Sequence, residues 1–275
     1  MSTVGRLVRR ALFPIGSVAT IRGGPLRGWR YRITEEAGWA PVFGRWEPEA
    51  QRAYAQLVRP AEVVWDLGAN TGIHTLLFAK LAGPGGQVVA FEPLEANARQ
   101  IRETCTLNAV ANVVVVEKAV SDSSGTQTFR LGKDDKQGSL VGIGCEDGTT
   151  MEVPCTTLDD FLESARRPDF VKIDIEGAES RALRGFERVR ECRPTFAIDL
   201  HTPSEDVAVG LWLRAHGYRA FRLLDATSRA HGTSRREFTP IADLAGGWPD
   251  PAGLWGTVIA VHPSRAAPLA TLLAP

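Results

Sequence analysis

The sequence has little of what disulfide scaffolds, zinc proteins, membrane proteins or nucleic-acid-binding proteins require. Its four cysteines show no C-x-x-C spacing, which argues against a disulfide framework and a zinc knuckle: Cys105, Cys145, Cys155 and Cys192. Basic and acidic residues each number 32, and the formal net charge of +0 predicts no general attraction to nucleic acid or anionic membranes. No apolar run approaches the ~20 residues that span a bilayer, and the first residues lack a signal-peptide pattern. We therefore expect a cytoplasmic protein without a membrane span, whose partner is a small or uncharged molecule.

Short apolar segments alternate with segments of helical periodicity along most of the chain. The apolar segments are nearly continuous in hydrophobicity, which is typical of parallel strands buried on both faces; they lie at 63–68, 87–93, 112–120, 170–177 and 195–201. Two more strands are expected as a hairpin-like pair at one edge, at 218–224 and 254–261. Segments with apolar residues at three-and-four spacing predict helices at 74–83, 94–110, 158–167 and 179–190. The pattern predicts an α/β fold with a mostly parallel seven-stranded sheet and helices on both faces.

The N-terminal part differs from this alternation. Residues 17–46 combine glycines and aromatic residues without a helical period and predict a small β-rich element, followed by a short helix at 47–59. The aromatic residues of this element either form a lid or acceptor pocket over a ligand or pack the element onto the sheet: Trp29, Tyr31, Trp39, Phe43 and Trp46. We expect three regions, namely an N-terminal extension, a main domain and a C-terminal tail, at 1–60, 61–263 and 264–275.

A long irregular connection is predicted at 225–253, which is rich in Gly, Pro, Ser and Arg. Its arginine-rich part at 227–238 either holds an anionic acceptor or is a solvated loop. The tail at 264–275 is mildly apolar and either covers an edge, mediates association or is disordered.

The segment VVWDLGANTG at 63–72 predicts a ligand-binding turn between a buried strand and a helix that starts near Ile73. Gly68 and Gly72 allow a ligand to approach the backbone closely, and Asp66 supplies a carboxylate at the carboxyl edge of the sheet. A dinucleotide-binding loop would read G-x-G-x-x-G, with the pyrophosphate at the helix N-terminus. The different spacing and the carboxylate favour a ligand with a cationic amino group and no phosphate, as in S-adenosylmethionine.

Further polar residues follow the other predicted strands. Glu92 ends the second strand, where an acid accepts hydrogen bonds from ribose hydroxyls. In VKIDIEGAES the strand alternation places Lys172, Asp174 and Glu176 on one side, and in IDLH Asp199 and His201 occupy the same edge of the following strand. Ligands of open α/β sheets bind at this edge, so we expect these side chains to meet there.

Five stretches together resemble the FkbM-type methyltransferase family. They are VVWDLGANTGIHTLLFAK, VVAFEPLEANARQI, LN…NVVVVEKAVSD, TTLDDFL and VKIDIEGAESRALRG, and FGRWEPEA at 43–50 is similar to the family's lead-in to the first strand. The resemblance implies a Rossmann-like class I fold, S-adenosylmethionine as cofactor and methyl transfer, typically to a hydroxyl of a sugar, glycan or secondary metabolite. The fifth strand of the family often ends in Glu where this chain has Asp199, and residues 225–253 match no part of the pattern.

The resemblance also assigns roles to individual residues. The cofactor loop would contain Asp66, Gly68, Asn70 and Gly72. Glu92 would be the ribose-binding acid, and Asp174 and Glu176 would face the methionine part of the cofactor or the acceptor.

Methyl transfer to an alcohol needs a group that removes the hydroxyl proton. We expect His201 to be this general base, oriented by Asp199 or Glu176, while His74 is a competitor that could equally pack beneath the cofactor. We assign no metal, although Asp174, Asp199 and His201 offer divalent-ion ligands, so a metal-assisted version stays open.

Two other functions stay open beside O-methylation. A nicotinamide-dependent oxidoreductase would share the early strands and Glu92, but the G-x-G-x-x-G loop is missing. A non-catalytic S-adenosylmethionine-binding protein would not need the acids of KIDIEG. The acceptor and the oligomeric state are open.

Overall fold

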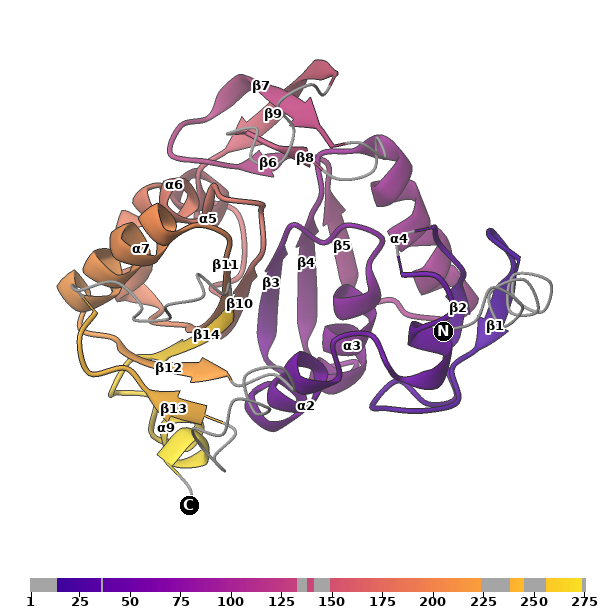
Figure 1. Cartoon of the computed structure of the whole chain (residues 1–275), viewed down its shortest axis with the longest axis horizontal. Coiled ribbons are helices and arrows are strands. Elements are labelled where there is room, and N and C mark those ends of the chain that lie inside the picture. Colours follow the sequence, from indigo (N-terminus) through magenta and orange to yellow (C-terminus); the bar gives the residue numbers. More distant parts are fainter. Residues whose placement is uncertain are drawn as a thin grey trace.

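The largest unit of the computed structural model is an eight-stranded mixed sheet, in the order β13-β12-β14-β11-β10-β3-β4-β5 (Figure 1). The structure describes residues 14–35, 37–132, 138–140, 149–223, 238–244 and 256–273. The strands of this sheet are β3 (Val63–Leu67), β4 (Gln87–Phe91), β5 (Val113–Val116), β10 (Phe170–Ile173), β11 (Thr195–Leu200), β12 (Arg219–Leu223), β13 (Phe238–Pro240) and β14 (Gly256–Val261).

Five neighbouring strands, from β5 to β11, run parallel. The chain leaves β3 toward β4 and β5 on one side, and returns to β10 and β11 on the other side. This reversal beside β3 is a topological switch point, where open α/β sheets bind ligands beyond the carboxyl ends of their strands. The register across it pairs Lys172 directly with Asp66.

The structure corrects the predicted count of seven strands. Strand β14 lies between β11 and β12, antiparallel to both, and β13 adds an eighth strand outside β12. The expected pair at 218–224 and 254–261 is thus antiparallel as predicted, but it does not form the edge, because β13 does.

Helices cover both faces of the sheet, as the alternation predicted. Residues of β3, β4 and β10 alternate between two hydrophobic clusters: Val64 and Val88 join one, whereas Trp65, Phe91 and Val171 join the other. The first cluster includes residues of α2 (Pro48–Leu57), α3 (Ile73–Ala82) and α9 (Ala266–Leu273), and α4 (Glu95–Leu107) packs beside α3. The second includes residues of α5 (Leu158–Leu162), α6 (Glu179–Arg184), η2 (Glu187–Glu191) and α7 (Pro203–Ala215).

A second sheet of four strands has no counterpart in the sequence expectations. Its order is β6-β9-β7-β8, with β6 (Ala119–Val120), β7 (Gly125–Leu131), β8 (Gly138–Ser139) and β9 (Thr150–Thr156). The strand expected at 112–120 therefore divides, because β5 stays in the large sheet and β6 enters the small one. The small sheet lies beyond the carboxyl ends of the parallel strands (Figure 1), and Phe129 and Val153 form a small core with Leu94.

The N-terminal segment is built onto the main sheet. Strands β1 (Val18–Thr20) and β2 (Arg30–Arg32) pair antiparallel, and η1 (Pro41–Phe43) precedes α2. Tyr31 is buried in the same cluster as residues of α3, β10 and β14, so this segment does not have a core of its own. Leu272 of α9 joins that cluster, which shows the tail covering α2. The three predicted regions stay a prediction.

Most of the predicted connection at 225–253, including all of the arginine-rich part except Phe238, and Cys145 lie outside the described residues. Within the described residues, no helix is both long and apolar enough to span a bilayer.

Candidate active site

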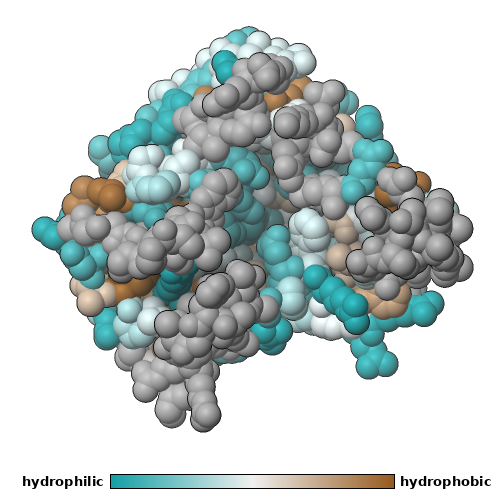
Figure 2. Space-filling view, viewed as in Figure 1, coloured by the Kyte–Doolittle hydropathy of each residue, from teal (hydrophilic) through white to brown (hydrophobic). Residues whose placement is uncertain are grey.

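A cavity of about 570 Å³ opens at the carboxyl ends of the strands that flank the switch point. Its wall is formed by the loops that follow β3, β4, β10 and β11, by Trp46 and Glu47 of the N-terminal segment, and by two residues of the small-sheet region, Phe129 of β7 and Leu140 after β8. Figure 2 shows hydrophilic residues lining the hollow in the middle of this face. The volume lies within the range of small-molecule and cofactor sites, ~300–1,000 Å³.

The predicted turn after β3 lies in this wall and requires its first glycine. Gly68 has φ 75°, and a Cβ atom there would lie 1.9 Å from the carbonyl oxygen of Asp174. Only a residue without a side chain lets the loop after β3 and the loop after β10 approach so closely. Asn70 lines the cavity, whereas Gly72 begins α3 behind the wall, where a Cβ atom would lie 2.8 Å from Ile101.

Glu92 lies at one end of the cavity and binds the turn. Its Oε2 accepts a hydrogen bond from the backbone N–H of Asn70 at 2.8 Å, and its Oε1 accepts one from Leu94 at 3.0 Å. The side chain is buried, and this burial raises the pKa of Glu92 to about 7 although the hydrogen bonds from Leu94, Asn70 and Asn97 oppose the rise. The remaining acceptor capacity of this carboxylate could serve the ribose hydroxyls, as predicted.

Asp66 does not line the cavity, in contrast to its predicted place in the cofactor loop. It is fully buried within β3, where Oδ2 accepts a hydrogen bond from the Thr75 hydroxyl at 2.6 Å and Oδ1 lies 3.4 Å from Lys172 Nζ. Because Asp66 precedes the end of its strand, its carboxylate supports the wall from behind. The cavity residue at this point is Asp174, whose Oδ2 lies 3.2 Å from the same ammonium group.

Lys172 is a buried cation between these carboxylates. Burial lowers its pKa, but the charges of Asp174, Asp66 and Asp199 outweigh this effect and raise the pKa above that of an exposed lysine. Lys172 also donates to the carbonyl oxygen of Gly68 at 3.2 Å, which fixes the turn to β10.

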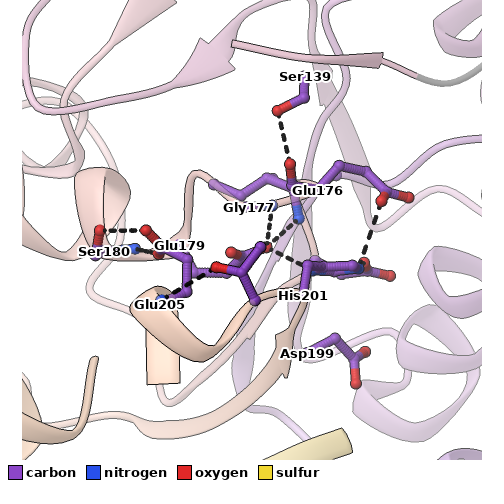
Figure 3. A network of polar contacts seen from close by, with 12 residues as sticks. Ser139, Glu176, Gly177, Glu179, Ser180, Asp199, His201 and Glu205 are labelled. Atoms are coloured by element: carbon purple, nitrogen blue, oxygen red, sulfur yellow. Dashed lines mark hydrogen bonds and ion pairs between the residues drawn. The ribbon is translucent and has the colours of Figure 1, made fainter. Parts of the chain in front are cut away.

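His201 lies at the other end of the cavity among carboxylates. Its Nδ1 is 3.0 Å from Glu179 Oε1, and its Nε2 is 3.5 Å from both Asp174 Oδ1 and Glu176 Oε2 (Figure 3). Burial lowers the pKa of His201, but the hydrogen bond to Glu179 and the surrounding negative charges outweigh it and raise the pKa to about 9. A pKa of about 9 keeps His201 protonated at neutral pH, whereas a general base must be unprotonated before it can act.

Asp199 and His74 also line the cavity. Asp199 accepts a hydrogen bond from the Thr257 hydroxyl of β14, and burial together with the charge of Asp174 raises its pKa to about 6. Asp199 thus neighbours β14 and does not orient His201 by a hydrogen bond. Burial and the charge of Lys172 lower the pKa of His74 to about 3, so its imidazole is neutral.

One group of side chains in the described residues has the spacing of metal ligands. It consists of Asp174, Glu176 and His201, whose ligand atoms lie within 4.8 Å of one another. Asp199, which the metal-assisted alternative included, is not part of it. The group offers no sign of an ion apart from its spacing, so we assign no metal.

Several residues that form or support the cavity wall were missed in the sequence. Glu179, which holds His201, resembles any acid in the first turn of a helix, where acids are common, so its pattern carries no distinct signal. The residues beside the small sheet were missed together with that sheet. Trp46 lies in the wall, whereas Tyr31 packs in the core, so the predicted aromatic element contributes to both.

The fold and the cavity together indicate a class of protein. A parallel core with a ligand cavity at its switch point and an acid after the second strand is typical of Rossmann-like enzymes that bind a nucleoside cofactor. A family model described as "Methyltransferase FkbM domain" matches residues 66–220, which is more than half of the chain. The chain belongs to this family, and its cofactor is S-adenosylmethionine. This membership decides against a nicotinamide-dependent oxidoreductase.

Similar proteins cover only part of the chain. A hexuronic acid methyltransferase from Haloferax volcanii is 25% identical over 159 residues, which is 57% of this chain and 63% of that protein. A 31-O-demethyl-FK506 methyltransferase from Streptomyces tacrolimicus is 29% identical, over 58% of this chain and 74% of that protein. Among solved structures, a precorrin-6y C5,15-methyltransferase from Geobacter metallireducens aligns with a TM-score of 0.46 at 15% identity, over 78% of this chain and 88% of that one.

The residues of the cavity fit S-adenosylmethionine. Beside Glu92 the wall is apolar and suits the faces of a purine: Phe91, Leu94, Ala119 and Val120. Asp174, whose side chain is 28% exposed, presents a carboxylate that could bind an ammonium group. The turn at Gly68 brings backbone to the space between these two points, with no side chain in the way.

Proposed function

We propose that the chain is an O-methyltransferase that uses S-adenosylmethionine to methylate a hydroxyl of a sugar, glycan or secondary metabolite. The observation that carries this proposal is a single cavity that reaches from Glu92 at one end to Asp199 and His201 at the other. A cofactor at the first end and an acceptor at the second would share this one cavity. The names of the two relatives support the choice of acceptor, because one refers to hexuronic acid and the other to an O-demethylated compound.

In this proposal the loop residues hold the cofactor. Glu92 binds the ribose hydroxyls, Asn70 and the Gly68 turn lie along the cofactor, and Asp174 binds the ammonium group. Asp66 and Gly72 act from behind the wall, Asp66 by holding Lys172 and Gly72 by starting α3 close to Ile101. When bound, the cofactor supplies a methyl group that is already activated, because it is attached to a sulfonium whose remainder leaves as a neutral thioether. Alignment of the acceptor oxygen, the methyl group and the sulfur therefore lowers much of the barrier.

At the acceptor end, His201 and Asp199 exchange the roles of proton acceptor and supporting group that the sequence predicts. Asp199 accepts the proton of the acceptor hydroxyl as the oxygen takes the methyl group, because a carboxyl with a pKa of about 6 is ionised at neutral pH yet basic enough to act. His201, protonated at that pH, donates a hydrogen bond from Nε2 toward the oxygen as negative charge develops on it. Glu176 helps to hold that charged ring, since its carboxylate lies 3.5 Å away.

A labelled-methyl screen tests this function. The full chain is incubated with S-adenosylmethionine that carries a deuterated methyl group and with panels of monosaccharides, glycosides, uronic acids and hydroxylated polyketides. We expect a mass shift on a hydroxyl-bearing compound, and fragmentation should locate the label on oxygen. Label found only on nitrogen or carbon would contradict the oxygen acceptor, and cofactor binding without transfer across all panels would favour a non-catalytic binding protein.

A further inference from the structure

Glu179 of α6 is the most buried charge near the acceptor end, with a side chain that is 0% exposed. One of its oxygens, Oε1, accepts from three donors, namely the backbone N–H of Ile175 at 3.2 Å, that of Gly177 at 3.0 Å and Nδ1 of His201 at 3.0 Å. Figure 3 shows Glu179 between the loop after β10 and the His201 ring. A single buried oxygen therefore connects two parts of the cavity wall.

The loop that Glu179 holds has an unusual backbone. Glu176 has φ 54°, a left-handed conformation that costs a residue with a side chain about 1–3 kcal/mol and persists only when its surroundings enforce it. Both N–H groups that flank Glu176 in the sequence donate to Glu179, and the Glu176 carbonyl accepts the Ser139 hydroxyl of β8 at 2.7 Å. These three contacts hold Glu176 in the conformation that turns its carboxylate toward His201.

The same oxygen decides which face His201 presents. A carboxylate oxygen can only accept, so the Nδ1 atom that faces Glu179 must carry a proton. The other ring nitrogen, Nε2, then faces Asp174 and Glu176 at 3.5 Å. The second oxygen of Glu179, Oε2, is buried and receives no hydrogen bond from the described residues. All the hydrogen bonds that Glu179 accepts from them therefore go to Oε1.

We propose that Glu179 is a positioning residue that fixes both the His201 ring and the Glu176 loop, so that Nε2 and the Glu176 carboxylate meet at the acceptor end of the cavity. The catalytic purpose of this positioning rests on the proposed function. The arrangement of Glu179, His201 and Glu176 can be measured without any acceptor. Glu179 does not line the cavity, and it acts through the two residues that do.

The charges around His201 come from four elements. Its environment includes acids from the loop after β10, from α6 and from β11, and a cation of β10 that the acids partly neutralise: Asp174, Glu176, Glu179, Asp199 and Lys172. Glu205 of α7 is also close to α6, but it binds the backbone N–H and hydroxyl of Ser180 at 2.6 and 2.8 Å. Glu205 is therefore a matched control, a carboxylate of the same network that His201 does not contact in any described hydrogen bond.

An imidazole titration by NMR tests the proposal on the cofactor-free full chain. His201 signals are assigned by their loss in His201→Asn. We expect a pKa near 9 in the wild type. Glu179→Gln keeps an oxygen for the backbone donors but removes the charge, and we expect it to lower the pKa of His201 by roughly one unit or more. Glu205→Gln should leave that pKa nearly unchanged.

Three results would overturn the proposal. The first is a His201 pKa that does not change in folded Glu179→Gln, and the second is an equal shift in Glu205→Gln. The third needs no variant and covers the case that Glu179→Gln does not fold: a wild-type His201 with an unprotonated Nδ1 near pH 8 would contradict the contact. Because the titration uses no acceptor, a negative methyl-transfer screen would refute the proposed function and leave this arrangement intact.

Discussion

The two ends of the cavity are built in different ways. At the cofactor end, Glu92 binds backbone N–H groups of Asn70 and Leu94, and all three residues belong to one continuous strand-turn-helix-strand segment. At the acceptor end, His201 is held by Glu179 and faces Asp174 and Glu176, which belong to other elements. The first end depends on local geometry, and the second depends on charges that only the tertiary fold brings together.

In the proposed function, this difference assigns cofactor binding to one end of the cavity and methyl transfer to the other. At the cofactor end, backbone N–H groups of Asn70 and Leu94 hold Glu92, which suits recognition of the uncharged adenosine part of S-adenosylmethionine. The acceptor end has an excess of carboxylates over cations, and this excess keeps His201 protonated while Asp174 raises the pKa of Asp199. A substitution at the cofactor end should therefore change cofactor binding most, and one at the acceptor end should change methyl transfer most. The exception is a substitution at Gly68, where the two ends meet.

The largest effect is expected at Gly68, where the two ends touch. In Gly68→Ala the Cβ atom would lie 1.9 Å from the Asp174 carbonyl oxygen, so one of the two loops must move. We expect a loss of at least about 3 kcal/mol in the free energy of unfolding, measured with urea, together with loss of cofactor binding. The control is Gly38→Ala, which also has a positive φ, of 53°, but meets no atom within 4 Å and should cost only about 1–2 kcal/mol. Equal costs for the two variants would contradict the close approach.

The pH dependence of stability should contain a separable contribution from Glu92 at the cofactor end. Burial raises the pKa of Glu92 from 4.5 to about 7, so the folded chain holds this proton more tightly than the unfolded chain does. The stabilisation is complete below pH 4.5 and is lost as the pH rises through 7, by roughly 3 kcal/mol in total.

Urea unfolding of the wild type and Glu92→Gln at several pH values between about 4 and 8 isolates this contribution. The difference in unfolding free energy between the two should shift in favour of the variant as the pH rises. Glu95→Gln, on the exposed side of α4, should show no such shift. A difference that is constant with pH would contradict the buried, proton-holding state of Glu92.

The smallest effect is expected at Ser139, which supports the Glu176 loop from the small sheet. Ser139→Ala removes the hydrogen bond to the Glu176 carbonyl and should cost about 1 kcal/mol. We expect a several-fold lower kcat in the transfer assay and an unchanged cofactor Kd by calorimetry. Loss of cofactor affinity with an unchanged kcat in Ser139→Ala would show that Ser139 supports the cofactor end, which contradicts this prediction.

The cofactor end could be predicted from the sequence because its parts are close along the chain. The strands at 63–68 and 87–93, the helix after Gly72 and the acid at Glu92 all follow from apolar runs, glycines and strand ends. The burial of Asp66 could not be predicted, because sequence spacing cannot show that Lys172 of β10 lies opposite Asp66. The number of strands was wrong because β13 has only three residues.

The acceptor end could be predicted only in part. Asp174, Glu176, Asp199 and His201 were expected at one edge, and the structure brings them together. Their protonation states could not be inferred, because these depend on burial and on Glu179. Helix α7 was missed although Thr202 caps it and Glu205 stands at the third helical position, a recognisable start signal. The small sheet was missed because its strands β7 and β9 leave half of their residues exposed and lack a continuous apolar run.

The most direct test of the two-ended site compares Glu92→Ala with Asp199→Asn in two assays, cofactor Kd by calorimetry and single-turnover methyl transfer at saturating cofactor. Glu92→Ala should weaken cofactor binding by roughly 10–100-fold, as expected for loss of charge-assisted hydrogen bonds. Asp199→Asn should keep the cofactor Kd within about threefold and lower the transfer rate by roughly 100-fold or more. Asp206→Asn is the control, because burial also raises the pKa of Asp206 to about 6 but this residue lies outside the cavity wall. Full transfer by Asp199→Asn, or equal loss of cofactor binding in Asp199→Asn and Glu92→Ala, would contradict the account.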